Sequence, residues 1–206
     1  MAGKSDLPYT TLTKIESNVI TKHSIQTVVK TADGLGIKID DLVKLIMKIN
    51  TNYINEYREL IKTTNLQKGY QEFIKFFRGL RTYLAGNMSE YKFTGNIVEN
   101  NMDYSYFQFN DVELQSKGLK FVVAFIHDKF EYEIWLSGMN RKTQINLHRR
   151  LSNVKHPYTM SPDPSRFDYI LKDKLVKEIN YDDCEGLFDS ARNNIVTFVK
   201  EVKRFV

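Results

Sequence analysis

The sequence is poor in cysteine, histidine and proline, and it has no long hydrophobic run. Its single cysteine, Cys184, excludes an internal disulfide and is typical of a protein that folds in a reducing compartment. One thiol and four histidines lack the close spacing of metal ligands, so we expect no metal site and no cofactor. No apolar stretch is long enough to cross a bilayer, and the N-terminus has no signal-peptide core. These absences predict a cytoplasmic protein without a membrane partner.

Signatures of catalysis are also absent. The glycines form neither a nucleophile elbow nor a phosphate-binding loop. The order of elements expected from residue 66 to 176 is compatible with a restriction-nuclease-like fold, in which Asp128, Glu131 and Glu133 would hold a metal. No lysine follows either glutamate at the spacing that such a site needs. We therefore interpret these acids as solvent-facing strand residues, assign no catalytic residue and favour a protein that is not an enzyme.

The composition is that of a folded protein. The 206 residues are 42% hydrophobic and 13% aromatic, which leaves room for one or two domains with a sizeable core. The formal net charge is +5, so nucleic acid is permitted as a partner without being required.

A short polar helix is expected at residues 8–17. Pro8 suits its first position, and Leu12 and Ile15 lie three apart on the side that would face a core. The outward side chains are short hydroxyls, a phenol and a cation, which are chemical groups that bind base edges and phosphates.

This helix opens a series of blocks that resembles the helix-turn-helix domain of Cro/CI-like bacterial repressors. The matching blocks are LPYTTLTKIE (7–16), SIQT (24–27), LGI (35–37) and DDL (40–42). The resemblance covers about residues 1–46 and implies that residues 8–17 are the recognition helix, with the chain beginning inside the second of five family helices. The DNA-binding residues that it implies are Tyr9, Thr10, Thr11, Thr13, Lys14, Ser17 and Lys22.

Helical periodicity continues after this segment. Residues 42–62 are expected to be helical, and we expect residues 47–67 to form a bridge between domains; an amphipathic core helix fits the pattern equally well. A break at residues 65–69 precedes another helix with an apolar stripe, which should end at residues 85–87.

From about residue 91 the hydrophobic period becomes alternating. Residues 104–109 read as a strand, and residues 119–126 and 130–136 as an antiparallel hairpin around a short turn. A basic helix at 140–151, a last strand at 167–176 and a C-terminal helix with a core-facing stripe complete the pattern. The fold class is therefore α+β: a partial helix-turn-helix segment, then a mixed sheet with flanking helices.

The second part also resembles a known group of sequences. The blocks YSYFQF (104–109), LKF (119–121), IWLSG (134–138) and NRK (140–142) are similar to the core of an uncharacterised bacterial domain family over about residues 68–206. The resemblance implies a compact α+β domain and brings no assigned activity.

A basic run marks the expected helix at 140–151. The cations Arg141, Lys142, Arg149 and Arg150 occur with no acid between Met139 and His156. They could hold a phosphate, a nucleotide or the DNA backbone, and the helix start is the part most worth testing. An ordinary solvated helix face is the alternative, and we favour it.

The resulting hypothesis is a DNA-binding transcriptional regulator with a C-terminal domain that senses, dimerises or binds a partner. Its partner would be double-stranded DNA, and we expect that it can bind as a homodimer. The competing hypothesis is that the α+β domain carries the function as an enzyme or ligand-binding module, with an N-terminal remnant that does not bind DNA.

Overall fold

The computed structural model describes residues 25–41 and 49–206, and the chain divides into two compact units, residues 1–67 and 68–206. The first unit contains helix α3, which spans Ile25–Leu35. Gly36 follows it with φ +68°, a left-handed conformation that glycine adopts without steric cost. The start of the expected helix at 42–62 lies outside the described residues.

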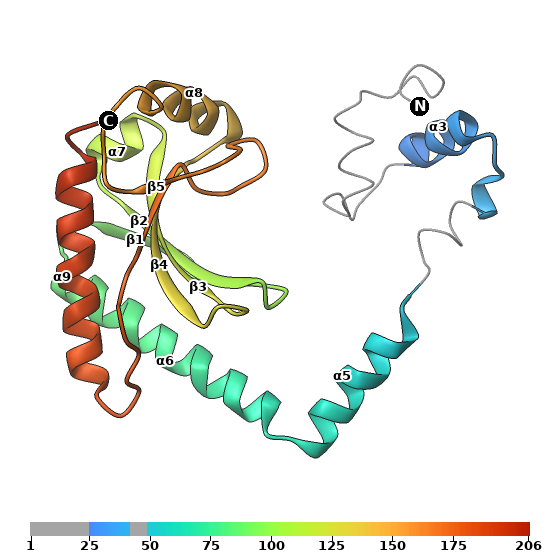
Figure 1. The fold of residues 1–206 in the computed structure, drawn as a ribbon, viewed down its shortest axis with the longest axis horizontal. Helices are drawn as coiled ribbons and strands as arrows, with labels where there is room; N and C mark the ends of the chain where they lie inside the picture. Colours follow the sequence, from blue (N-terminus) through green and yellow to red (C-terminus); the bar gives the residue numbers. More distant parts are fainter. Residues whose placement is uncertain (1–24, 42–48) are drawn as a thin grey trace. The chain divides into compact units, whose positions relative to one another are not determined.

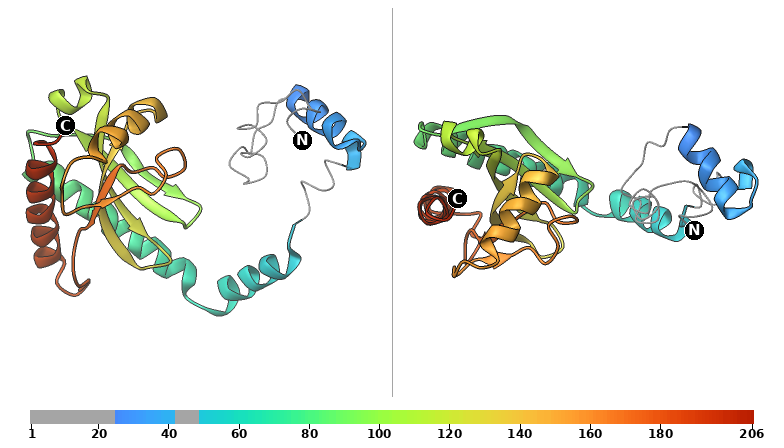
Figure 2. Two further views of the ribbon diagram at one scale, coloured as in Figure 1. Left: turned by 45° about the horizontal axis from the view of Figure 1, so that its top comes forward. Right: turned by 90° about the horizontal axis from the view of Figure 1, so that it is seen from above.

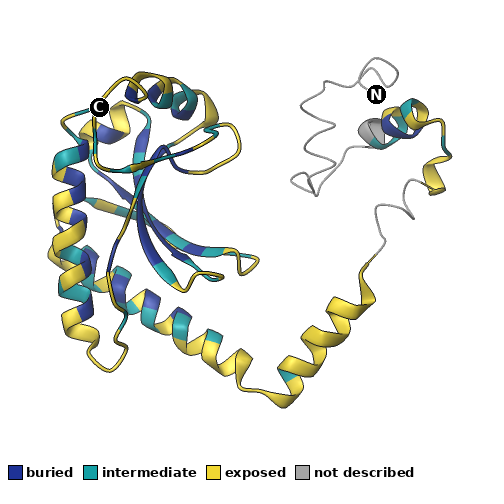
Figure 3. Cartoon of the chain, in the orientation of Figure 1, coloured by how far each residue is buried: buried dark blue, intermediate teal, exposed yellow. Residues whose placement is uncertain are grey.

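Helix α5, Thr51–Thr63, forms the described part of that expected helix. Asn50 caps its N-terminus, because its side-chain oxygen accepts a hydrogen bond of 3.1 Å from the Asn52 amide. Every residue of α5 except Ile61 is exposed (Figure 3). The alternative that this segment is an amphipathic core helix is therefore wrong for Thr51–Thr63.

The second unit, residues 68–206, which we call the sheet domain, is drawn in Figure 1. Its elements in chain order are α6 (Leu66–Asn87), β1 (Lys92–Asn100), β2 (Tyr104–Asn110), α7 (Val112–Ser116), β3 (Leu119–Ile126), β4 (Glu131–Gly138), α8 (Arg141–Leu151), β5 (Thr159–Met160), β6 (Leu171–Lys174) and α9 (Cys184–Val202). Helix α6 begins inside the break expected at 65–69, and it ends at Asn87 as predicted.

The strands form one sheet in the order β1-β2-β3-β4-β6-β5, and each neighbouring pair is antiparallel. The α+β class with flanking helices is confirmed, and the described sheet is antiparallel rather than mixed. The hairpin of β3 and β4 is also confirmed, with Val123 opposite Ile134. The turn between them includes Phe130 at φ +54°.

The main core lies between one face of the sheet and the two long helices α6 and α9 (Figure 2). Phe77 of α6 packs on Phe107 of β2, with ring centroids 5.0 Å apart, and Phe198 of α9 packs edge-on against Phe121 of β3. Alternation explains this arrangement, because every second residue of a strand points to the same face. The predicted core-facing stripe of the C-terminal helix is confirmed at Ala191, Ile195, Phe198 and Val202.

The opposite sheet face carries a smaller cluster, in which no residue of a described helix takes part: Val122, Ala124, Trp135 and Tyr169, with Tyr104, Tyr106 and Ile126 packed against it. The strand expected at 167–176 is much shorter, Leu171–Lys174. Its first residues instead lie beside this face, where the Phe167 and Asp168 carbonyls accept hydrogen bonds from Arg141 and Ser137. Those carbonyls accept hydrogen bonds from side chains rather than from a neighbouring strand, so strand pairing begins only at Leu171 and not at the expected residue 167.

Candidate functional site

A polar cleft opens on the second sheet face where the strands meet the start of α8. Its volume is about 290 Å³, near the lower end of the roughly 300–1,000 Å³ of small-molecule sites. The lining comes from β2, β3, β4, the first turn of α8 and the segment before β6, and comprises Tyr104, Tyr106, Lys120, Val122, Trp135, Gly138, Met139, Asn140, Arg141, Gln144 and Asp168.

Asp168 is the centre of a hydrogen-bond network on one side of the cleft. Its carboxylate accepts a 2.6 Å bond from the Tyr104 hydroxyl and a 3.0 Å bond from the Arg141 guanidinium. Burial is the main cause that raises the pKa of Tyr104, and its hydrogen bond to Asp168 is the second. The phenol therefore stays protonated and donates a hydrogen bond at neutral pH. Arg141 also donates to the carbonyls of Pro164 and Phe167, at 3.0 and 2.5 Å. The positive charge of Arg141 is therefore already compensated within the chain.

The start of α8 closes the end of the cleft. Asn140 caps the helix, and its side-chain oxygen accepts a 2.9 Å bond from the Thr143 amide. Gly138 lies so close to this turn that an added Cβ would stand 2.7 Å from the backbone nitrogen of Gln144. The Gln144 side chain is buried; it accepts from the Gly138 amide at 3.2 Å and donates to the Phe167 carbonyl. These contacts fix the helix start against β4.

Lys120 is the cleft's other cation, and it differs from Arg141 in having no acidic partner. Its ammonium donates a 2.7 Å bond to the neutral Gln108 side chain. The ion pairs found among the described residues do not include Lys120. Burial lowers the pKa of Lys120, and the negative charge of Asp168 opposes that shift. The cleft therefore holds one cation whose charge no carboxylate pairs with directly.

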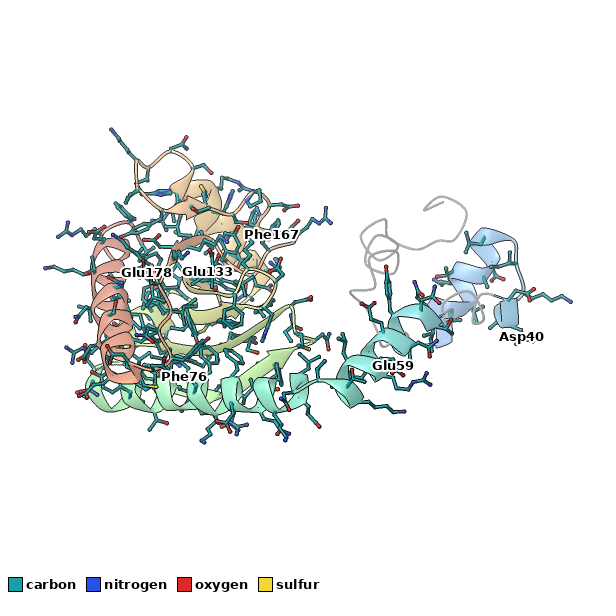
Figure 4. The ribbon with its side chains drawn as sticks, turned by 60° about the horizontal axis from the view of Figure 1, so that its bottom comes forward. Asp40, Glu59, Phe76, Glu133, Phe167 and Glu178 are labelled. Atoms are coloured by element: carbon teal, nitrogen blue, oxygen red, sulfur yellow. The ribbon has the colours of Figure 1, made fainter. Side chains whose placement is uncertain are left out.

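Aromatic rings form part of the lining of the cleft. The Tyr104 ring lies 5.7 Å from that of Tyr106 and 5.2 Å from that of Trp135, measured between centroids. The Trp135 indole also donates a 2.6 Å bond to Glu133, which accepts a second bond, of 2.7 Å, from Lys172. Glu133 is 5% exposed and lies among the crowded side chains of the sheet domain (Figure 4). The interpretation of Glu133 as a solvent-facing acid is wrong, because its side chain is buried and hydrogen-bonded to Trp135 and Lys172.

The predicted basic site is divided by the structure. Arg141 lines the cleft, whereas Lys142, Arg149 and Arg150 are exposed on α8 and do not. Arg150 instead borders a separate hollow with Lys117 and Val206. The predicted DNA-binding residues Tyr9, Thr10, Thr11, Thr13, Lys14, Ser17 and Lys22 lie outside the described residues.

Sequence reasoning missed most of the cleft. Lys120 is the one charge within the apolar strand 119–126, which was a usable signal of a special position. The tyrosines at 104 and 106 alternate with core residues, and their shared face could have been deduced from that spacing. Asp168 gave no local signal, because its role depends on contacts with residues 27 and 64 positions away.

One pair resembles a nucleophile with its base. The Ser105 hydroxyl lies 3.0 Å from the His127 ring nitrogen Nε2. Ser105 has no exposed surface, however, and His127 packs against Phe73 and Phe125. Burial lowers the pKa of His127, while Asp103 and Glu99 oppose that shift. No substrate can reach this hydroxyl, so the pair is a packing feature. His127 follows β3 and is half-buried.

A family model described as a domain of unknown function (DUF7000) matches residues 47–206. The chain belongs to this family. The DUF7000 match includes α5 as well as the whole sheet domain. Comparisons with curated proteins and with solved structures found no match.

Within residues 25–41 and 49–206, His, Cys, Asp and Glu form no group of three or more that could hold a metal ion. Over the same residues, none of the helices combines the length and the apolarity that a membrane span requires.

Proposed function

We propose that the DUF7000 region of this chain is a ligand-binding module that takes a small molecule in the cleft on the second sheet face. The observation that carries the proposal is the fixed polar wall beside a group of neighbouring aromatic rings. Tyr104, Arg141 and Asp168 hold one another in place, and Gln144 anchors the helix start. Such pre-organisation lowers the entropy that binding costs, which is how small-molecule sites gain affinity.

Binding is better supported than catalysis at this site. Asp168 already accepts two strong hydrogen bonds, so it has little capacity left to act as a general base. Tyr104 is held protonated by its surroundings. These groups suit the recognition of a ligand whose polar atoms match a fixed pattern.

The single tryptophan provides the test. Trp135 lines the cleft, so its indole N–H signal in a nitrogen-15 NMR spectrum reports on binding there. We expect members of a small aromatic fragment library to shift this signal saturably. Tyr106→Ala, which removes part of the cleft wall, should weaken binding roughly tenfold, the loss of about 1.4 kcal/mol of contact.

Tyr53→Ala is the matched control, because Tyr53 is an exposed tyrosine of α5 and does not line the cleft. It should leave fragment binding unchanged. If no fragment shifts the Trp135 signal saturably, or if the two variants behave alike, the cleft is not a ligand site and the proposal fails.

We also propose that the chain is a transcriptional regulator in which this module senses the ligand and residues 1–46 bind double-stranded DNA. The four separate blocks similar to Cro/CI-like repressors support this second function. As a regulator the protein would act in the cytoplasm, which agrees with an exposed, unpaired Cys184, and it would bind its site as a homodimer.

A further inference from the structure

We infer that the ligand of the cleft is a small planar anion: a single aromatic or heteroaromatic ring that carries one carboxylate or an equivalent acidic group. This inference rests on the proposed function of the cleft as a ligand site and adds the chemical class of the ligand. Three properties of the lining carry it: its charge, its rings and its size.

The charge of the lining favours an anion. Lys120 and Arg141 are its cations, and Asp168 is its only carboxylate among the lining residues. Arg141 and Asp168 pair at 3.0 Å, so one positive charge, that of Lys120, stays without an ionic partner. A neutral ligand would strip water from this ammonium and return at most a hydrogen bond without an opposite charge, whereas an anion would pair with it in a partly dry site.

The aromatic lining favours a planar ligand. Tyr104, Tyr106 and Trp135 bring three rings to one cleft, and flat ligands gain offset-stacked or edge-on contacts with such rings. A cationic aromatic would also find ring faces here. Lys120 opposes such a ligand, because two like charges would share a site with little water.

The size of the cleft and its end wall set the remaining limits. A volume of about 290 Å³ fits one ring system with a short substituent and excludes a dinucleotide or an acyl chain. Asn140 and Arg141 also line it, so the first turn of α8 adds the positive end of a helix dipole to the charge of Lys120. Both contributions make the cleft more positive and therefore favour an anion.

The experiment compares benzoate with three probes that change its charge or its ring: benzamide is neutral, benzylammonium is cationic, and cyclohexanecarboxylate keeps the charge without a planar ring. Dissociation constants are measured on the full chain by NMR titration of the Trp135 indole signal. We expect benzoate to bind most tightly, and at least about tenfold more tightly than benzamide, the factor that one charge-assisted hydrogen bond implies. Cyclohexanecarboxylate should be weaker than benzoate, and benzylammonium the weakest of the four.

Lys120→Gln should reduce the preference for benzoate over benzamide to less than about threefold. Lys120→Arg should keep the preference, because it restores the charge. Lys200→Gln is the matched control, since Lys200 is exposed on α9 and does not line the cleft. It should behave like the unchanged chain.

The outcomes separate this inference from the proposed function. If benzoate and benzamide bind equally, or benzylammonium binds best, the cleft is a ligand site and the inference of an anion is overturned. If Lys120→Gln leaves the preference intact, the charge argument is likewise wrong. If none of the four probes binds while neutral fragments do, the ligand class is wrong; if nothing at all binds, the proposed function falls and takes this inference with it.

Discussion

Glu133 shows how the environment of a single residue decides its role. Simple alternation along β4 places it on the face opposite the main core, which for an antiparallel sheet usually means water. Here that face is covered in part, and Glu133 accepts from both Lys172 and Trp135. The neighbouring acid Glu131 sits at the open end of the same strand and pairs with Lys174 at 2.9 Å, half in solvent. The two glutamates therefore form a natural comparison.

We expect Glu133→Gln to lower the free energy of unfolding by about 3 kcal/mol, because it leaves the partly buried Lys172 ammonium without its counter-charge. Glu131→Gln should cost less than about 1 kcal/mol, as is usual for exposed pairs. Urea denaturation of the two variants measures both values. Equal losses would show that the surroundings of Glu133 are as wet as those of Glu131.

At the scale of elements, the sequence predicts well wherever one hydrophobic period runs without interruption. The β3–β4 hairpin, α6 and α9 are such cases, because each contributes a regular series of apolar residues to the main core. The short elements α7 and β5 carry too few residues for a period to be visible. The segment before β6 was read as strand from its composition, but its carbonyls bond to side chains of β4 and α8. Tertiary contacts of that kind have no local signal.

The junction of β4 and α8 gives a prediction at this scale. In Gly138→Ala the new methyl group would stand 2.7 Å from the Gln144 nitrogen and 2.9 Å from the Asn140 carbonyl oxygen. Backbone atoms cannot give way cheaply, so the first turn of α8 should shift and stability should fall by about 1–3 kcal/mol. The Trp135 indole signal should move as well, since the shifted turn lines the same cleft.

Gly86→Ala is its control, because Gly86 lies near the end of α6 and a Cβ there would meet nothing within 4 Å. This variant should be neutral or gain up to about 1 kcal/mol, since alanine restricts the unfolded chain and favours helix. Thermal unfolding of both proteins tests the pair. An equally stable Gly138→Ala would mean that the helix start is not packed on β4 as described.

At the scale of the whole molecule, the sequence and the structure inform different parts of the chain. Four ordered blocks in residues 1–46 predict a DNA-binding segment from sequence. Most of the cleft could not be predicted from the sequence, because its residues come from segments between Tyr104 and Asp168 that only the fold brings together. Arg141 was the exception, since an uninterrupted basic run drew attention to the start of α8. Even so, its bonds to Asp168 and to two carbonyls give it a structural role that charge alone did not indicate.

The last prediction concerns DNA. If residues 1–46 bind a cognate site, Thr10→Ala and Lys14→Ala should each weaken that binding by about 1–3 kcal/mol, and should weaken binding to random DNA much less, because base contacts carry the sequence information. Lys22→Ala is the internal control: a phosphate contact should weaken both kinds of DNA alike. Affinity should also fall steeply with salt, as counterion release requires. The measurement is a salt-titrated binding assay with the full chain on the DNA around its own gene. Binding that does not change in the Thr10 and Lys14 variants, or that is absent even at low salt, would leave the cleft of the DUF7000 region as the functional centre of this chain.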